Sequence, residues 1–275
     1  MCCECRAYWF SSNTVLCAFH RGAWSVSLLE AHTIHSVFDS STGKRIIVKR
    51  EYHCITDHKS HTWDATQIFL TDIHGDMQKH GDFSIRREMT DGAIDFKSKS
   101  PLVSVGLSWA LNKFARENNQ TLPGKGKGEC DRTGGHFGGF VKIIMKMVDA
   151  ASRTGIARPS NARDLYNLLR SHTSFLKPVV RPGLTVFKIL LFADQSDFPD
   201  PHDLVQGLSG FKGTRSHFCY ATPPENKDLD MEWPMYRGKG EVDLLFRRLT
   251  CGCDLCGNCD YDRCLRKETV GVMQR

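Results

Sequence analysis

The sequence predicts an α/β protein with a mixed sheet flanked by helices and a small cysteine-rich, zinc-binding tail. Three observations predict this architecture. Residues 1–56 contain short apolar or alternating runs that are typical of strands. From Trp63 onward, residues that we expect to be buried recur at spacings of three and four, as on one face of a helix. Finally, residues 251–264 hold five of the twelve cysteines of the chain.

Short strand-like runs are separated by turn signals. The first three cover residues 14–19, 23–28 and 45–49, with a turn predicted at residues 40–43. A fourth alternating run at residues 83–89 ends at a turn that contains Asp91 and Gly92. The apolar run at residues 185–193 predicts a late strand. Such runs, interleaved with helices, favour a central sheet.

Four helices are expected between the strands. The first has one face that carries Trp63, Gln67, Leu70, Ile73 and Met77, which we interpret as core. The second is predicted over residues 101–117. The third is predicted to begin near Gly135, and the fourth to run from Ser160, a good N-cap residue, to about His172. We expect three parts: residues 1–175, an extension of strand and loops at 176–248, and the tail at 249–275.

Composition indicates a globular protein. Of its 275 residues 40% are hydrophobic and 25% are charged, and the net charge of +6 fits a polyanionic partner without requiring one. No leader or membrane-spanning run is evident, so we expect an intracellular protein with no membrane partner. In a reducing compartment clustered cysteines indicate a metal site rather than disulfides.

Acidic residues at element ends have two interpretations. Asp57 and Asp91 follow strand-like runs, while Asp131, or Glu129 as its alternative, precedes a helix. Converging carboxylates would hold Mg²⁺ for phosphodiester chemistry. Taken alone, the pattern favours turns and helix caps. The glycine-rich segment at residues 124–136 lacks the spacing of a phosphate-binding P-loop, but its amides and two lysines would suit a nucleic-acid phosphate.

Four segments, taken together and in order, resemble a group of eukaryotic transposon-encoded proteins related to DDE transposases. The matching stretches are MTDGAIDFKSK at residues 89–99, GKGECDRTGG at 126–135, ITDHKSHTWDA at 55–65, and FKGTRSHF at 211–218 followed by RLTCGCDLC at 248–256. The resemblance spans roughly residues 50 to 256.

The resemblance implies an RNase H-like fold and a nuclear protein that cleaves and joins DNA with Mg²⁺ or Mn²⁺. Asp91 would follow the fourth strand as one metal ligand, and Asp131, or less readily Glu129, would be the late acidic residue at a helix. Asp57 would be a ligand only under a different alignment. Four lysines would contact DNA phosphates: Lys97, Lys99, Lys125 and Lys127.

The sequence also departs from the group. Its members carry an early strand that ends in an acidic motif and supplies the first metal ligand, whereas here residues 7–9 match the tryptophan segment that follows it. A two-metal site that lacks one carboxylate would hold its ions poorly. The resemblance therefore implies an amino-terminally truncated or degenerate transposase derivative, whose catalytic competence stays open. The alternatives are a non-enzymatic zinc-binding interaction module and a poorly folding remnant.

The cysteines of the tail have the spacing of a zinc site. Thiolates two residues apart can surround one tetrahedral Zn²⁺, and five thiols allow one complete four-ligand site with one to spare. The alternative is a tail with free, reduced thiols. We favour zinc, because exposed free thiols at this density are reactive. The expected ligands are drawn from Cys251, Cys253, Cys256, Cys259 and Cys264.

Overall fold

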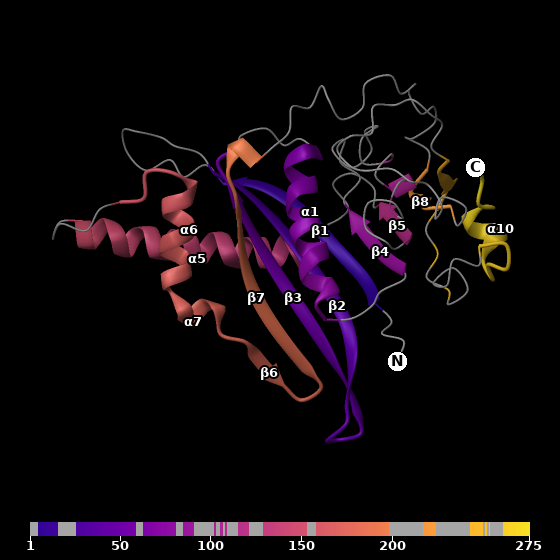
Figure 1. The fold of residues 1–275 in the computed structure, drawn as a ribbon, viewed down its shortest axis with the longest axis horizontal. Coiled ribbons are helices and arrows are strands. Elements are labelled where there is room, and N and C mark those ends of the chain that lie inside the picture. The colour runs from indigo at the N-terminus through magenta and orange to yellow at the C-terminus, as the bar shows by residue number, and fades with distance from the viewer. Residues whose placement is uncertain are drawn as a thin grey trace. The chain divides into compact units, whose positions relative to one another are not determined.

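A computed structural model of the chain describes residues 5–15, 26–58, 63–80, 85–90, 102, 105–106, 108, 115–120, 129–152, 158–197, 217–223, 243–249, 251, 253 and 261–275. It confirms an α/β protein with a mixed sheet (Figure 1). It also contains a cysteine cluster near the C-terminal end. The chain forms two compact units, each built from separate stretches of sequence. Unit 1 comprises residues 1–8, 77–126 and 199–275, and unit 2 comprises residues 9–76 and 127–198. The three predicted parts do not correspond to these units, and their boundaries stay a prediction.

The sheet of unit 2 is built around a long antiparallel pair, β2 (Val26–Asp39) and β3 (Lys44–Thr56). The turn between them, at residues 40–43 as predicted, is held by Asp39, whose carboxylate accepts hydrogen bonds from Ser41 and Thr42. On the other side, β3 pairs in parallel with β7 (Leu184–Ala193), which pairs with the short edge strand β6 (Val179–Arg181). The strand order in this unit is β6-β7-β3-β2-β1, where β1 (Cys5–Val15) contributes its residues 9–15.

Helices cover both faces of this sheet. Tyr52 of β3 donates a hydrogen bond to Asp76 of α1 (Trp63–Gln78), at 2.8 Å. The next residue, His53, stacks on Phe137 of α5 (Glu129–Ser152) with 4.3 Å between ring centroids. Because successive strand residues point to opposite faces, α1 and α5 lie on opposite sides of the sheet. Two further helices, α6 (Ala162–Ser171) and α7 (Thr173–Leu176), share the α5 side, since Leu169 of α6 packs in one cluster with Phe137 of α5 and Phe175 of α7 stacks on Phe140 of α5.

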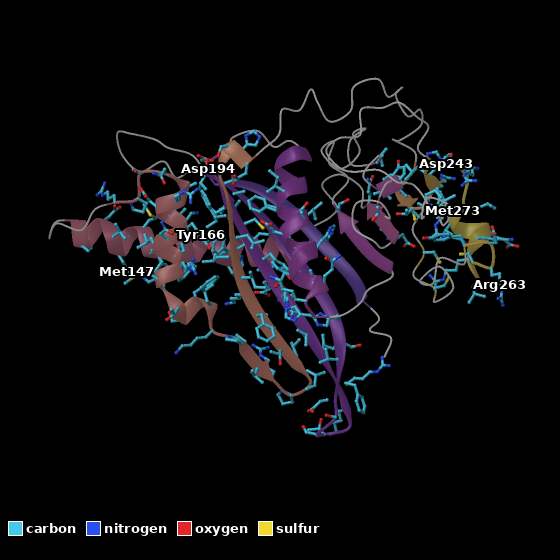
Figure 2. All side chains as sticks on the ribbon, in the orientation of Figure 1. Met147, Tyr166, Asp194, Asp243, Arg263 and Met273 are labelled. Atoms are coloured by element: carbon cyan, nitrogen blue, oxygen red, sulfur yellow. The ribbon has the colours of Figure 1, made fainter. Side chains whose placement is uncertain are left out.

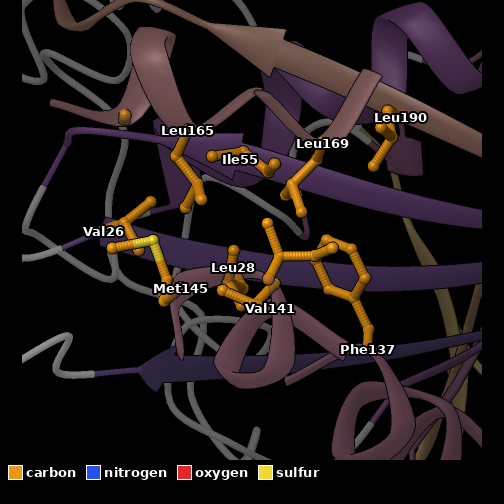
Figure 3. Packing of buried hydrophobic residues seen from close by; sticks show 11 residues of the cluster. Val26, Leu28, Ile55, Phe137, Val141, Met145, Leu165, Leu169 and Leu190 are labelled. Atoms are coloured by element: carbon orange, nitrogen blue, oxygen red, sulfur yellow. The ribbon is translucent and has the colours of Figure 1, made fainter. Parts of the chain in front are cut away.

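The main core of unit 2 lies between the sheet and the pair α5 and α6 (Figure 3). Strand residues Leu28 and Ile55 meet Phe137 of α5 and Leu165 and Leu169 of α6, all less than 5% exposed. On the opposite face, the α1 residues Leu70, Ile73 and Met77 are at most 1% exposed, which confirms these three members of the predicted apolar face as core; the side chains of the other two, Trp63 and Gln67, lie outside the described residues.

Two helix starts differ from the prediction. The third helix begins at Glu129, six residues before Gly135. Glycine disfavours helices, yet the four glycines inside this helix adopt helical backbone. The fourth is capped by Asn161, not Ser160: Asn161 Oδ1 accepts a hydrogen bond from the Asp164 amide, at 2.8 Å. Ser160 instead donates to the Asp164 carboxylate, so both residues close the same helix end.

Unit 1 contains four short strands in the order β4-β5-β8-β9. The first pair, β4 (Ile85–Thr90) and β5 (Ala115–Gln120), is parallel, and β8 (Cys219–Ala221) and β9 (Leu245–Arg247) continue the sheet antiparallel. The predicted helix over residues 101–117 is therefore wrong at its end, although Leu102, Val105, Gly106 and Ser108 are helical. The sequence ARENNQ of β5 carries no β-branched or aromatic residue that would predict a strand.

The chain end is tied back to the sheet of unit 1. Phe246 of β9 and Gln274 exchange two backbone hydrogen bonds of 2.8 Å, next to the helix α10 (Lys267–Val270). Met273, labelled in Figure 2, packs against the buried cluster that contains Cys251 and Cys264. The C-terminal segment is thus an integral part of this unit. In the described part of the chain, none of the helices has both the length and the apolar character needed to cross a membrane.

Candidate metal centre

Three cysteines of the tail meet because two separate segments are fixed by backbone hydrogen bonds. Cys251 and Cys253 follow β9, which is anchored through the bond from the Leu249 amide to the Val270 carbonyl, at 3.1 Å. Cys264 lies just before α10, and its carbonyl accepts a hydrogen bond from the Lys267 amide, at 3.3 Å. The strand and the helix therefore deliver thiols from opposite ends of the connecting loop to one point.

The three sulfur atoms form a small triangle. Cys264 Sγ lies 3.6 Å from Cys251 Sγ and 4.0 Å from Cys253 Sγ, and all three sulfurs lie within 4.8 Å of one another. These separations are too long for a disulfide bond. A tetrahedral ion with Zn–S bonds of about 2.3 Å would place its sulfur ligands about 3.8 Å apart. The sulfur–sulfur separations of 3.6 and 4.0 Å fall on either side of that value, so the triangle fits three corners of a zinc tetrahedron.

The local backbone also suits a metal thiolate. The amide of Cys253 donates to Cys251 Sγ at 3.5 Å, a contact that stabilises negative charge on sulfur. Cys251 and Cys264 are buried, each 6% exposed, and Cys253 is half-buried. Burial is the largest cause that raises the pKa of Cys251, with further increases from the neighbouring thiols. A bound cation would reverse this effect, because it favours the thiolate form.

A buried cation lies beside the sulfurs. Arg247 of β9 is 2% exposed, and its Nη1 atom lies 3.8 Å from Cys264 Sγ. Its guanidinium lies 5.6 Å from the ring centre of Tyr261, whose hydroxyl donates to Glu117 at 3.0 Å. Since an arginine keeps its charge and a buried charge needs compensation, the negative charge of a zinc–thiolate group next to Arg247 would be stabilising.

The remaining predicted zinc ligands, Cys256 and Cys259, lie outside the described residues. Zinc in structural sites takes four ligands, so either of them is a candidate for the fourth position. The structure therefore supports three of the five predicted thiols as a group that can hold a metal, and the choice of the fourth stays a prediction.

The residues predicted to bind Mg²⁺ and DNA are described only in part. Asp91, Lys97, Lys99, Lys125 and Lys127 lie outside the described residues. Asp131 and Glu129 belong to the first turn of α5, and β4 ends at Thr90, the residue before Asp91. The predicted convergence of Asp91 with Asp131 stays a prediction.

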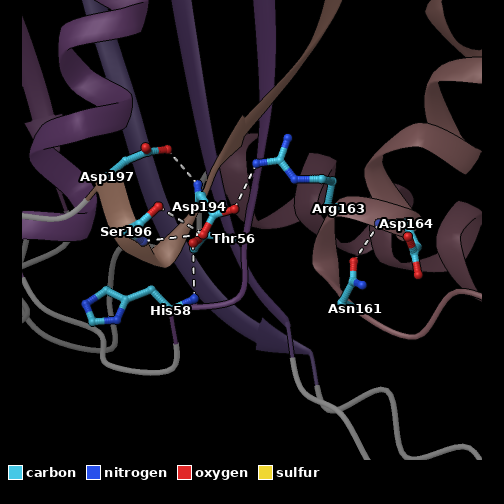
Figure 4. A network of polar contacts seen from close by, with 8 residues as sticks. All are labelled: Thr56, His58, Asn161, Arg163, Asp164, Asp194, Ser196 and Asp197. Atoms are coloured by element: carbon cyan, nitrogen blue, oxygen red, sulfur yellow. Dashed lines mark hydrogen bonds and ion pairs between the residues drawn. The ribbon is translucent and has the colours of Figure 1, made fainter.

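Asp57 is described and lies at the carboxyl end of β3. The last residues of β3 and β7, Thr56 and Ala193, are paired, so Asp57 and Asp194 follow two adjacent parallel strands. Asp194 is already engaged by Arg163 at 2.8 Å, and this contact is the main cause that holds the pKa of Asp194 low (Figure 4). Among the described residues, the only group of three or more potential metal ligands is the cysteine triangle. The contact between Asp194 and Arg163 therefore links the end of β7 to α6.

Sequence reasoning missed the buried residues that surround the thiols. Glu117 accepts hydrogen bonds from Tyr261 and from Asn119, at 3.0 and 2.8 Å, within a strand whose first three residues fall in the predicted helix. The signal for these residues is weak, because Glu117 and Asn119 alternate in a segment rich in residues that disfavour strands.

A scan against protein-family models and searches of curated proteins and of solved structures found no match to this chain.

Proposed function

We propose that the C-terminal cysteine cluster is a structural zinc site that stabilises unit 1. The observation that carries this proposal is the sulfur triangle of Cys251, Cys253 and Cys264, with separations of 3.6 and 4.0 Å. Thiolates prefer Zn²⁺ over hard ions such as Mg²⁺. Burial under Tyr261 and Val270 favours a closed, structural site over a catalytic one, which needs an open position for substrate or water.

A zinc ion at this point would link the two ends of the loop that joins β9 to α10. Among the described residues, the apolar members of the cluster around it are Ala221, Tyr261 and Val270, with Leu245 and Met273 at its edge, so few of them are large. A core this small provides limited stability, so a metal cross-link would contribute a substantial part of the folding free energy here. Such a module would serve as a scaffold for a partner or for DNA binding by the rest of the chain.

Metal analysis of the purified protein tests the zinc site. We expect one zinc per chain, and a tetrahedral thiolate absorption spectrum when Co²⁺ replaces Zn²⁺. The variant Cys253→Ser/Cys264→Ser should lose both signals. The variant Cys54→Ala should keep them, because the Cys54 thiol is buried in β3, outside the cluster. Full zinc content in the double serine variant would refute the proposal.

As a second function, we propose metal-dependent cleavage and strand transfer on nuclear DNA by an RNase H-like, transposase-derived fold. The strand pattern supports this candidate: the antiparallel pair β2 and β3 is followed by α1, and β4 then pairs in parallel with β5. The end of β4 at Thr90, directly before Asp91, and the presence of Asp131 in the first turn of α5 fit the positions that the resemblance implies. Mg²⁺ or Mn²⁺ would be held by these carboxylates.

Nicking of supercoiled plasmid DNA in the presence of Mn²⁺ tests the second function. We expect nicking by the full chain and at least a 100-fold loss of nicking rate in Asp91→Asn and in Asp131→Asn. A two-metal site depends on each carboxylate ligand, and replacing one such group commonly lowers the rate by about 10²–10⁴. Glu268→Gln, which removes an exposed carboxylate of α10, is the matched control. Zinc content without nicking would support the structural site alone, as a non-enzymatic module.

A further inference from the structure

Unit 2 contains a cavity of about 400 Å³ on the α5 side of its sheet. The face of the sheet changes character along its strands. At the carboxyl end of β3, Ile55 and its neighbours are covered by α5 and α6. Toward the start of β3, Lys49, Glu51 and His53 point to the same side, because strand residues alternate, and here they line the cavity. Its volume lies in the range of small-molecule sites, about 300–1,000 Å³.

The cavity is strongly cationic. Among the described residues, its walls carry two lysines and two arginines but a single carboxylate, that of Glu51. Glu51 is occupied by Lys49, whose Nζ lies 2.8 Å away. The other cations come from three elements, Arg132 on α5, Arg181 on β6 and Lys188 on β7. Neither Arg181 nor Lys188 forms an ion pair with a described carboxylate. The charges of Arg181 and Lys188 on one side of the cavity attract an anion and repel a cation.

The cavity is also lined by flat apolar groups. Phe175 of α7 lies beneath Lys188, with the ammonium 4.3 Å from the ring centre, and Phe137 of α5 lies next to it, at 5.7 Å between centroids. Val179 of β6 extends this apolar wall to the solvent-exposed rim. An inorganic anion would use only the charges. The combination of charges with aromatic and aliphatic walls suits a ligand that has both an anionic and a flat apolar part.

A buried histidine adds a specific polar group to the floor. His53 lines the cavity, is 1% exposed and stacks on Phe137. Its Nδ1 atom lies 2.8 Å from the carboxylate of Glu30, which fixes the ring orientation. Its second nitrogen, Nε2, is buried and has no hydrogen-bond partner among the described residues. A buried nitrogen without a partner is costly, so a bound ligand or water would stabilise this site.

We propose that this cavity binds a phosphate-bearing ligand with a flat apolar ring, of the nucleotide class. Arg132, Arg181 and Lys188 hold the phosphate, for which guanidinium groups have matching geometry. The Phe137 and Phe175 side of the cavity accommodates the ring. All lining residues belong to unit 2, so this site is independent of the zinc cluster in unit 1. The ligand is either a free nucleotide or a nucleotide within a nucleic-acid strand, which share this chemistry.

Titration of the full chain with pyrophosphate, dAMP and a short single-stranded oligonucleotide tests the proposal. We expect dAMP or the oligonucleotide to bind at least tenfold more tightly than pyrophosphate. The critical variants are Val179→Asp and Val180→Asp. Both are exposed neighbours on β6, but only Val179 lines the cavity. Val179→Asp should weaken binding about tenfold or more, because it adds a negative charge to the wall of the cavity that repels the phosphate, and Val180→Asp should change it less than twofold.

A second pair of variants separates local from general charge effects. Arg181→Gln/Lys188→Gln should weaken binding about tenfold or more, whereas Arg170→Gln, which removes an exposed charge on α6, should have little effect. Each variant is compared by thermal unfolding, which should be unchanged for the exposed positions. Binding of dAMP identifies a free nucleotide, and binding of the oligonucleotide alone identifies a strand. No binding of either at millimolar concentration, or equal losses in the cavity and control variants, would overturn the proposal.

Discussion

Alanine at two glycines of α5 should stabilise the protein. Gly135 and Gly139 lie in the interior of a 24-residue helix, and neither has a positive φ angle. A Cβ atom built at either position meets no described atom within 4 Å. The replacement therefore introduces no clash and recovers the helix propensity that glycine lacks, about 0.8–1.0 kcal/mol for each residue. The double variant should gain about 1.6–2.0 kcal/mol, since the residues are neighbours on the helix but share no contact that alanine would break.

The assay is thermal and urea unfolding of the wild-type protein and Gly135→Ala/Gly139→Ala. A gain of this size should raise Tm by about 3–8 °C in a unit of this length. Gly43→Ala is the opposing control. Gly43 lies in the β2–β3 turn with φ of 65°, so alanine there should cost about 1–2 kcal/mol although it also meets no described atom. An unchanged or lower Tm in the double variant would refute the reasoning that these glycines are free of packing constraints.

Three further predictions concern residues of unit 2. Leu169→Ala should destabilise the protein by about 2–5 kcal/mol, because Leu169 is fully buried between α6 and the sheet, as measured by urea unfolding. Asn161→Ala should cost about 1 kcal/mol through loss of the α6 cap, whereas Ser160→Gly should cost less; equal effects would contradict the cap assignment. Burial raises the pKa of Glu30, so its contribution to stability is present at low pH and is lost as pH rises through the raised pKa. The free energy of unfolding of the wild-type protein should therefore fall relative to Glu30→Gln as pH rises above about 4, the ordinary pKa of a glutamate, and a constant difference would contradict the raised pKa.

The sequence predicts best where side-chain periodicity reflects burial. Leu70, Ile73 and Met77 repeat with helical spacing and are core residues of α1, and the run at residues 185–193 is β7 almost to the residue. In both cases the residues that pack together are neighbours along one element, so their pattern is visible without knowledge of the fold.

Prediction fails where tertiary contacts outweigh local preference. β5 is a strand because β4 and β8 pair with it on both sides, although its sequence ARENNQ favours neither a strand nor burial. Glu117 is tolerated there because Tyr261, far along the chain, donates a hydrogen bond to it. The cavity was missed for a related reason: Lys49 and Lys188 meet only through the parallel pairing of β3 with β7, which the sequence does not reveal.

The cysteines are an intermediate case. Their spacing predicts that thiols meet around a metal, and three of them do lie together. The contribution of Arg247 as a buried cation beside Cys264 depends on how β9 packs, so it is visible only in the structure.

The parallel pairing of β3 with β7 has a consequence for synthesis on the ribosome. Residue 56 is made long before its partner at residue 193, so the nascent β3 has an open edge while the intervening chain emerges. Such distant pairings are slow to form, and an unpaired apolar edge invites association with other chains. Unit 2 is completed at about residue 198, whereas the last cysteine of the triangle follows later, so translation itself imposes an order in which the sheet closes first and the metal-binding segment forms last.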